Sequence, residues 1–240
     1  MGIATGVAVP APDPAWPEGT WTNTKGYRSG AVRATILYIA LAIEALAYAG
    51  LIVISVAGFG LVDRALSGSL TETEVTRYVA TEKGIAGLAL LAGILAVVML
   101  LAWLSRSVDN APNLLGGTPR WSPRWAIGWW FVPIAWWFVP YRIVADLDRR
   151  MAHGISAPAR WLLEIWWALW VFGGVVSEIV NYLPVNTAEQ VKTALTVQAF
   201  GYIPIIGSNV LTLLVVLRIQ RHGQTRALSI DQPPIPAPAT

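Results

Sequence analysis

Four long stretches of this chain are almost free of charged residues, and they limit the folds that it can adopt. They cover about residues 34–61, 84–104, 161–183 and 191–217. A helix needs about 20 apolar residues to cross the roughly 30 Å hydrocarbon core of a bilayer, and each stretch is long enough. Only 13% of the 240 residues are charged, about half the share in a soluble domain. The sequence therefore predicts an all-α fold, a polytopic bundle of membrane helices.

Polar and proline-rich sequence lies outside these stretches. We expect residues 1–30 and 223–240 to be disordered cytoplasmic tails, because they offer too little packable surface to offset the entropy lost on ordering. Residues 31–222 are then the transmembrane helical domain. Between the first two apolar stretches, Thr71 and Glu74 have the spacing of a capping box, in which each side chain bonds the other residue's backbone amide. This pair predicts the start of a helix.

A fifth stretch, residues 125–141, contains the sequence Trp-Trp-Phe-Val-Pro twice, at 129–133 and 136–140. Pro133 removes a backbone donor from its middle and disfavours helix just before it. Tryptophan prefers the headgroup level of a membrane, and ten of the 13 tryptophans lie between residues 121 and 170. We therefore expect this stretch to be re-entrant or interfacial, with equivalent residues of the two copies on one face wherever it is helical.

Lysine and arginine favour the cytoplasmic side of a membrane. If residues 125–141 do not cross, thirteen of the 17 basic residues lie on one side and four on the other, with both termini cytoplasmic. If all five stretches cross, the better orientation gives ten against seven. We predict four transmembrane helices plus one re-entrant or interfacial Trp/Pro-rich segment, in a multi-pass plasma-membrane protein. Five transmembrane helices is the alternative, and it requires a continuous kinked helix over residues 127–145.

Glu44 is the charged residue of the first apolar stretch. It follows Arg33 by eleven residues, about 16 Å along a helix, which places it near the middle of the bilayer. A charged group there usually faces the bundle interior or marks a functional site. We expect a neutral Glu44 hydrogen-bonded to Asn209 or Gln198, with proton or ion handling as the alternative. Tyr48, one turn later, shares its face.

A charged stretch follows the second Trp-Trp-Phe-Val-Pro. Its members are Arg142, Asp146, Asp148, Arg149, Arg150 and His153. We interpret the residues from Asp146 to His153 as a solvated face, and the arginines as contacts for anionic lipid headgroups. Elsewhere, small residues four apart, such as Ala89 with Gly93 and Gly173 with Ser177, predict close approach between helices.

The residues that we single out as functional candidates combine the intramembrane carboxylate, the repeated Trp/Pro sequence and the charged stretch. They are Glu44, Tyr48, Trp129, Trp130, Pro133, Trp136, Trp137, Pro140, Arg142 and Asp146. The chain has no cysteine and no metalloprotease, nucleophile-elbow, phosphate-loop or dinucleotide motif, so we expect no cofactor and no catalytic or metal site. Basic residues flank the apolar stretches instead of forming one patch, which argues against nucleic acid.

Three functions remain open. The leading one is a structural or interaction protein whose partners are the lipid bilayer and either further copies of the chain or another membrane protein. The second is a small transporter or channel, with Glu44 inside the bundle and the Trp/Pro segment as a gate. The third is a lipid-modifying membrane enzyme that uses Glu44 or Asp146 near the interface.

The Trp/Pro segment also resembles a known family signature. Residues 121–135 read Trp-Ser-Pro-Arg-Trp-Ala-Ile-Gly-Trp-Trp-Phe-Val-Pro-Ile-Ala, and Pro-Tyr-Arg follows at 140–142. This pattern is similar to that of a bacterial membrane family known as domain of unknown function 4328, over about residues 34–221. The resemblance implies a bacterial membrane location and a helical fold but no reaction. The chain departs from the family at Trp136 and Trp137, where a polar residue such as asparagine is usual.

Overall fold

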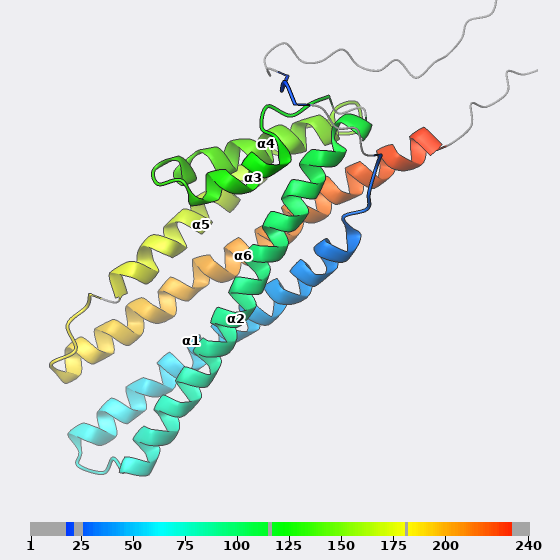
Figure 1. The fold of residues 1–240 in the computed structure, drawn as a ribbon. Helices are drawn as coiled ribbons and strands as arrows, with labels where there is room; N and C mark the ends of the chain where they lie inside the picture. Colours follow the sequence, from blue (N-terminus) through cyan, green and yellow to red (C-terminus); the bar gives the residue numbers. More distant parts are fainter. Residues whose placement is uncertain (1–17, 22–25, 115–116, 181, 232–240) are drawn as a thin grey trace, which may run out of the picture. The chain divides into compact units, whose positions relative to one another are not determined.

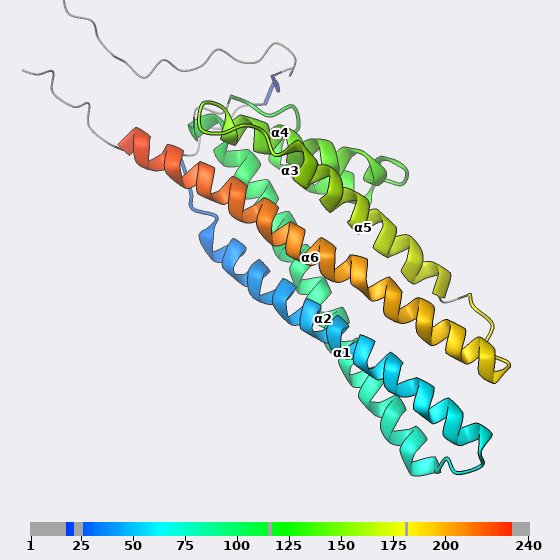
Figure 2. The same ribbon diagram turned by 180° about the vertical axis from the view of Figure 1, so that it is seen from behind.

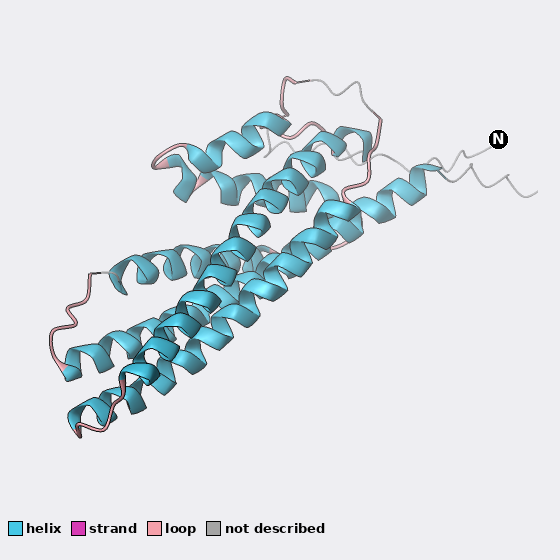
Figure 3. Cartoon of the chain, turned by 60° about the horizontal axis from the view of Figure 1, so that its bottom comes forward, coloured by secondary structure: helices cyan, strands magenta, loops and turns pink. Residues whose placement is uncertain are grey.

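The computed structural model describes residues 18–21, 26–114, 117–180 and 182–231 (Figure 1). Within these ranges the chain forms six α-helices and three 3-10 turns, and no strand occurs there (Figure 3). The helices are α1 (Ala31–Leu66), α2 (Glu72–Asn110), α3 (Pro123–Gly128), α4 (Val139–Ala152), α5 (Arg160–Val180) and α6 (Ala188–Asp231), and the turns are η1 (Pro112–Leu114), η2 (Trp129–Phe131) and η3 (Ala135–Trp137). The all-α fold predicted from the sequence is confirmed.

Three helices, α1, α2 and α6, are long and apolar enough to cross a membrane. Such helices imply contact with a lipid bilayer, since their apolar side chains otherwise lie in water. Helix α6 continues to Asp231, so the predicted start of a disordered tail at residue 223 is wrong for residues 223–231. Residues 232–240 lie outside the described part of the chain.

The start of α2 shows why this helix begins well before its apolar stretch. The backbone amide of Thr71 donates to Glu74 Oε2 at 3.0 Å, and the amide of Glu74 donates to Thr71 Oγ1 at 3.3 Å. These two bonds satisfy amides that have no partner inside the helix. The predicted capping box is confirmed, and it adds polar turns to the helix ahead of the membrane-length segment.

The chain divides into two compact units. Unit 1 consists of residues 1–34, 100–163 and 216–240, and unit 2 consists of residues 35–99 and 164–215. Unit 2 contains most of the length of α1, α2, α5 and α6. Unit 1 contains α3, α4, the three turns and the remaining ends of the long helices.

In unit 2 the helices approach closely at glycines. A Cβ on Gly58 would lie 2.8 Å from Leu195 and from the Tyr78 hydroxyl, and one on Gly173 would lie 3.0 Å from Ile205. Gly173 therefore allows α5 to lie along α6, as both views show (Figures 1 and 2). This confirms the close approach predicted for Gly173, whereas the side chain of Ser177 lies outside the described residues.

The core of unit 1 forms around Trp103, whose side chain is fully enclosed. Its indole Nε1 donates to Gln220 Oε1 at 3.0 Å. Leu104, Leu147 and Met151 are also buried. The core thus joins residues from the end of α2, from α4 and from the end of α6.

Residues 18–21 are held against the loop before α3. The amide of Gly19 donates to the Thr118 carbonyl at 3.0 Å, and Trp21 Nε1 donates to the Pro119 carbonyl at 2.7 Å. The disorder predicted for residues 1–30 therefore does not extend over residues 18–21, and residues 1–17 lie outside the described part of the chain.

The Trp/Pro segment is not one helix. Residues 123–152 form α3, η2, η3 and α4, separated at Val132 and around Ile134. Ile134 has φ +68°, a backbone conformation that is unfavourable for a β-branched residue. The two Trp-Trp-Phe-Val-Pro copies were expected to share one face only if the segment is helical, and this condition is not met because the segment is broken at Val132 and Ile134. The continuous helix over residues 127–145 that a fifth crossing requires is likewise absent.

Candidate functional site

The intramembrane carboxylate is bonded within unit 2. Asn209 Nδ2, from α6, donates to Glu44 Oε2, from α1, at 3.1 Å. The structure confirms Asn209 as a partner of Glu44. A Cβ on Gly93, in α2, would lie 2.7 Å from Glu44 Oε1. Glu44 therefore occupies space that exists because α2 has no side chain at residue 93, and three helices meet at this carboxylate.

Tyr48, one turn along α1 from Glu44, packs against Tyr202 of α6. The rings of Tyr48 and Tyr202 have their centroids 5.2 Å apart, and Gln198 Nε2 donates to Tyr202 Oη at 2.7 Å. Gln198, the other expected partner of Glu44, thus binds Tyr202 instead. The Glu44–Asn209 hydrogen bond and the Tyr48–Tyr202 ring contact are thus two contacts between α1 and α6.

The Trp/Pro candidates lie in unit 1 and differ in how far they are exposed. Trp129 and Trp130 in η2, and Trp136 and Trp137 in η3, are half-buried, and the rings of Trp136 and Trp137 pack with centroids 4.8 Å apart. Pro133 is exposed, whereas Pro140 is buried in the first turn of α4.

The most exposed side chains of this segment are apolar. Phe131 is 72% exposed, Ile134 is 77% exposed and Phe138 is 60% exposed. Phe131 and Phe138 are the equivalent residues of the two Trp-Trp-Phe-Val-Pro copies. Apolar side chains projecting from a tryptophan-rich surface are typical of a membrane interface.

The charged stretch in α4 differs from the solvated face predicted for it. Asp146 and Asp148 are each 1% exposed, and Arg150 is buried as well. Arg150 Nε donates to Asp146 Oδ1 at 2.8 Å, and Arg150 Nη1 donates to Glu18 Oε1 at 2.9 Å. The interpretation as a solvated face is wrong for these residues, because their ionic partners allow them to be buried.

Burial also alters the acidity of Asp146. Removal from water raises the pKa of Asp146, while the charge and hydrogen bond of Arg150 and the backbone amide of Arg120 act in the opposite direction. The raised pKa means that ionised Asp146 costs folding free energy despite its arginine. Asp146 is enclosed, so the structure does not present it as an exposed catalytic acid.

A second buried ion pair lies on the neighbouring side of α4. Arg218 Nε, from α6, donates to Asp148 Oδ1 at 2.7 Å, and Arg218 Nη2 donates to the Ala157 carbonyl at 2.6 Å. Arg226 donates to the backbone carbonyls of Met151 and His153. Sequence reasoning missed these contacts, because the partners lie about 70 residues apart and nothing in their local pattern links them. Arg142 is exposed on α4, apart from these buried pairs.

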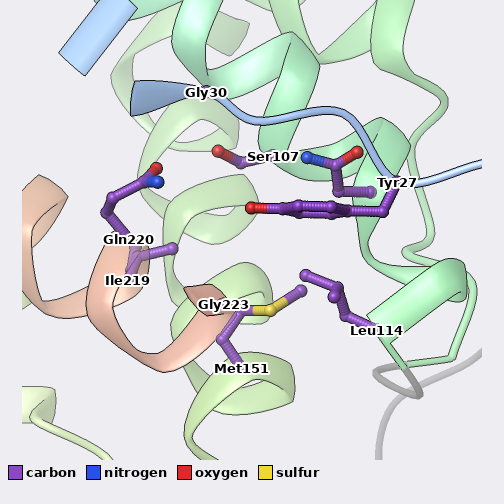
Figure 4. Close-up of a pocket in the computed structure, with 9 residues that line it drawn as sticks. Tyr27, Gly30, Ser107, Leu114, Met151, Ile219, Gln220 and Gly223 are labelled. Atoms are coloured by element: carbon purple, nitrogen blue, oxygen red, sulfur yellow. The ribbon is translucent and has the colours of Figure 1, made fainter. Parts of the chain in front are cut away.

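Unit 1 also has a small, partly open cavity of about 20 Å³ (Figure 4). Tyr27, Ser107 and Gln220 present polar groups to it, and Met151 and Leu114 close its apolar side (Figure 4). This volume fits about one water molecule. The cavity is too small for a substrate, and no cluster of three or more His, Cys, Asp or Glu suited to a metal occurs among the residues that the structure describes.

The fold and these contacts define an all-α membrane protein with a tryptophan-rich surface and buried ion pairs. The family described as "Domain of unknown function (DUF4328)" matches residues 67–221, which are 155 of the 240 residues. The chain belongs to this family. The match confirms the resemblance and begins later than the residue 34 expected. No curated protein and no solved structure matches the chain.

Proposed function

We propose that this protein is a structural or interaction module of the plasma membrane, acting through its helix faces with further copies of the chain or another membrane protein, and that it is not an enzyme. The observation that carries the proposal is the Glu44 contact. A carboxylate that handles protons or ions needs access to water. Glu44 instead accepts a hydrogen bond from Asn209 and lies over Gly93. These contacts favour helix packing over transport or gating.

A double-mutant cycle tests this role of Glu44. We expect Gly93→Ala to lower the free energy of unfolding in detergent by about 1–3 kcal/mol, because the new methyl group overlaps the Glu44 carboxylate. In a Glu44→Ala background the same change should cost much less, since the obstacle is gone. Gly87→Ala is the matched control in the same helix, because its Cβ would meet nothing within 4 Å.

Two outcomes contradict the packing role. One is that Gly93→Ala costs no more than Gly87→Ala. The other is a flux that depends on Glu44. In proteoliposomes under a pH or cation gradient, we expect wild type and Glu44→Gln to leak equally. A flux that depends on Glu44 would show transport instead.

For the topology, we propose four crossings, by α1, α2, α5 and α6, with both termini cytoplasmic. Helix α5 has 21 residues, or about 31 Å of helix, which is enough for one crossing. The broken Trp/Pro segment then lies at the cytoplasmic interface. The split of thirteen basic residues against four supports this arrangement, as do the exposed apolar side chains of Phe131, Ile134 and Phe138.

Cysteine labelling tests the topology against a clean background, since the chain has no native cysteine. We expect cysteines at Ser69 and Thr187 to react with an impermeant maleimide on intact cells. Cysteines at Ser122 and Ser156, which bracket the Trp/Pro segment, should react only after the membrane is permeabilised. Labelling of Ser122 and Ser156 from opposite sides would mean that the segment crosses and that the four-crossing proposal is wrong.

A further inference from the structure

A groove in unit 1 gathers three arginines next to the start of α3. Arg33 comes from the first turn of α1, Arg106 from the end of α2, and Arg124 from the first turn of α3. The groove is open and has a volume of about 510 Å³, within the range of about 300–1,000 Å³ that is common for ligand pockets. Two hydroxyl groups, of Ser105 and Ser122, also line it. Residues distant in the sequence thus converge on one polar recess.

The groove has an excess of positive charge. Its three arginines face one carboxylate, that of Asp109, so the formal charge of the lining is +2. Two other arginines of unit 1, Arg150 and Arg218, bind buried aspartates instead. Arg33 and Arg106 are half-buried and Arg124 is exposed, so the groove arginines are placed to meet a ligand from outside.

We propose that this groove binds an anion that carries a phosphate group. The planar guanidinium fork of arginine matches two phosphate oxygens at once, and charge-assisted bonds of this kind are stronger than neutral ones. A phosphate has enough oxygens to engage more than one arginine together with a serine hydroxyl. The excess of +2 suits a phosphate mono- or diester better than a neutral polar ligand.

Either a phospholipid headgroup or a small soluble phosphate would supply this chemistry. The residues after Arg124 favour the lipid, because Trp125 is 55% exposed and Phe131 is 72% exposed, as expected for a segment at the headgroup level. The lipid source rests on the proposed interfacial position of the Trp/Pro segment. Phosphate binding itself rests only on the groove, and it is independent of the role of Glu44.

The test uses the full chain purified in a neutral detergent. Native mass spectrometry measures the affinity for added phosphatidylglycerol, with phosphatidylcholine as the zwitterionic comparison. We expect the double variant Arg106→Gln/Arg124→Gln to bind phosphatidylglycerol about 25-fold more weakly, at about fivefold for each arginine removed. Arg106→Lys/Arg124→Lys keeps the charge but loses the fork, so it should weaken binding about fivefold.

The matched control is Arg28→Gln/Arg221→Gln, which removes two exposed arginines of unit 1 outside the groove. We expect it to weaken binding by less than about threefold, because charges outside the groove act on the headgroup only through solvent, where salt screens them. If both glutamine variants weaken binding equally, or if neither does, diffuse charge explains the binding and the groove proposal is wrong.

Competition by glycerol phosphate identifies the source: displacement of the lipid at similar concentration indicates a soluble phosphate, and no displacement indicates the lipid headgroup. Thermal unfolding without lipid checks that each variant is folded. If the groove glutamine variant does not fold, the lysine variant is used for the binding measurement in its place.

Discussion

Asp148→Asn should lower the free energy of unfolding of the detergent-solubilised protein by about 3 kcal/mol. Asparagine has the shape of aspartate but not its charge, so the Arg218 guanidinium loses the carboxylate that it binds at 2.7 Å. The Asp148 side chain is only 1% exposed and that of Arg218 is 22% exposed, so water replaces the lost partner poorly. Chemical unfolding followed by circular dichroism measures the effect.

The control for this variant is the same substitution at an exposed ion pair. Asp63 binds Lys192 in unit 2, and their side chains are 63% and 35% exposed. Asp63→Asn should therefore change the free energy of unfolding by less than about 1 kcal/mol. The double variant Asp148→Asn/Arg218→Gln should lose less than the sum of its single variants. Similar small losses for Asp148→Asn and Asp63→Asn would contradict a buried pair.

Trp103→Ala is expected to be the most destabilising change in the apolar core of unit 1, at about 3–5 kcal/mol. Trp103 has 0% exposure, so its removal leaves a cavity, and the bond from its Nε1 to Gln220 is lost as well. The close approach of Gly30 to the Trp103 ring, 3.4 Å from a Cβ built on that glycine, indicates tight packing that cannot collapse easily. Thermal and chemical unfolding in detergent measure the loss.

Two comparisons separate the cavity from the hydrogen bond. Trp103→Phe keeps much of the ring volume and loses the Nε1 donor, so we expect an intermediate cost. Trp161→Ala removes a tryptophan that is 65% exposed, and it should change stability little in detergent. A loss from Trp161→Ala as large as that from Trp103→Ala would mean that the enclosed core of unit 1 is wrongly placed.

The sequence predicts those parts of the fold whose cause is local. Apolar length indicates membrane helices, and Thr71 with Glu74 indicates the start of α2, because a cap depends on residues three positions apart. The Asn209 partner of Glu44 was also predictable, since few polar groups lie in the apolar stretches and a carboxylate at membrane depth needs one of them. Helix ends were less predictable, because α6 continues in polar sequence to Asp231.

Long-range ion pairs are the part that the sequence does not reveal. Asp146 and Asp148 stand among charged neighbours, a pattern typical of solvated surface. Their burial follows from Arg150 and Arg218, and only the fold shows that Arg218 reaches α4 from α6. The arginine groove was missed for the same reason, since its three cations come from three separate helices.

The backbone conformation at Ile134 makes isoleucine a costly residue at this position. Its φ of +68° suits glycine, and a β-branched residue there costs of order 1–3 kcal/mol. The side chain is 77% exposed, so packing within the chain offsets little of this strain energy. Transfer of an isoleucine side chain out of water is favourable by about 1.5–3 kcal/mol, which is similar in size to the backbone strain. Insertion of Ile134 into lipid would therefore offset the strain of its backbone, whereas exposure of the same side chain to water would leave that strain uncompensated.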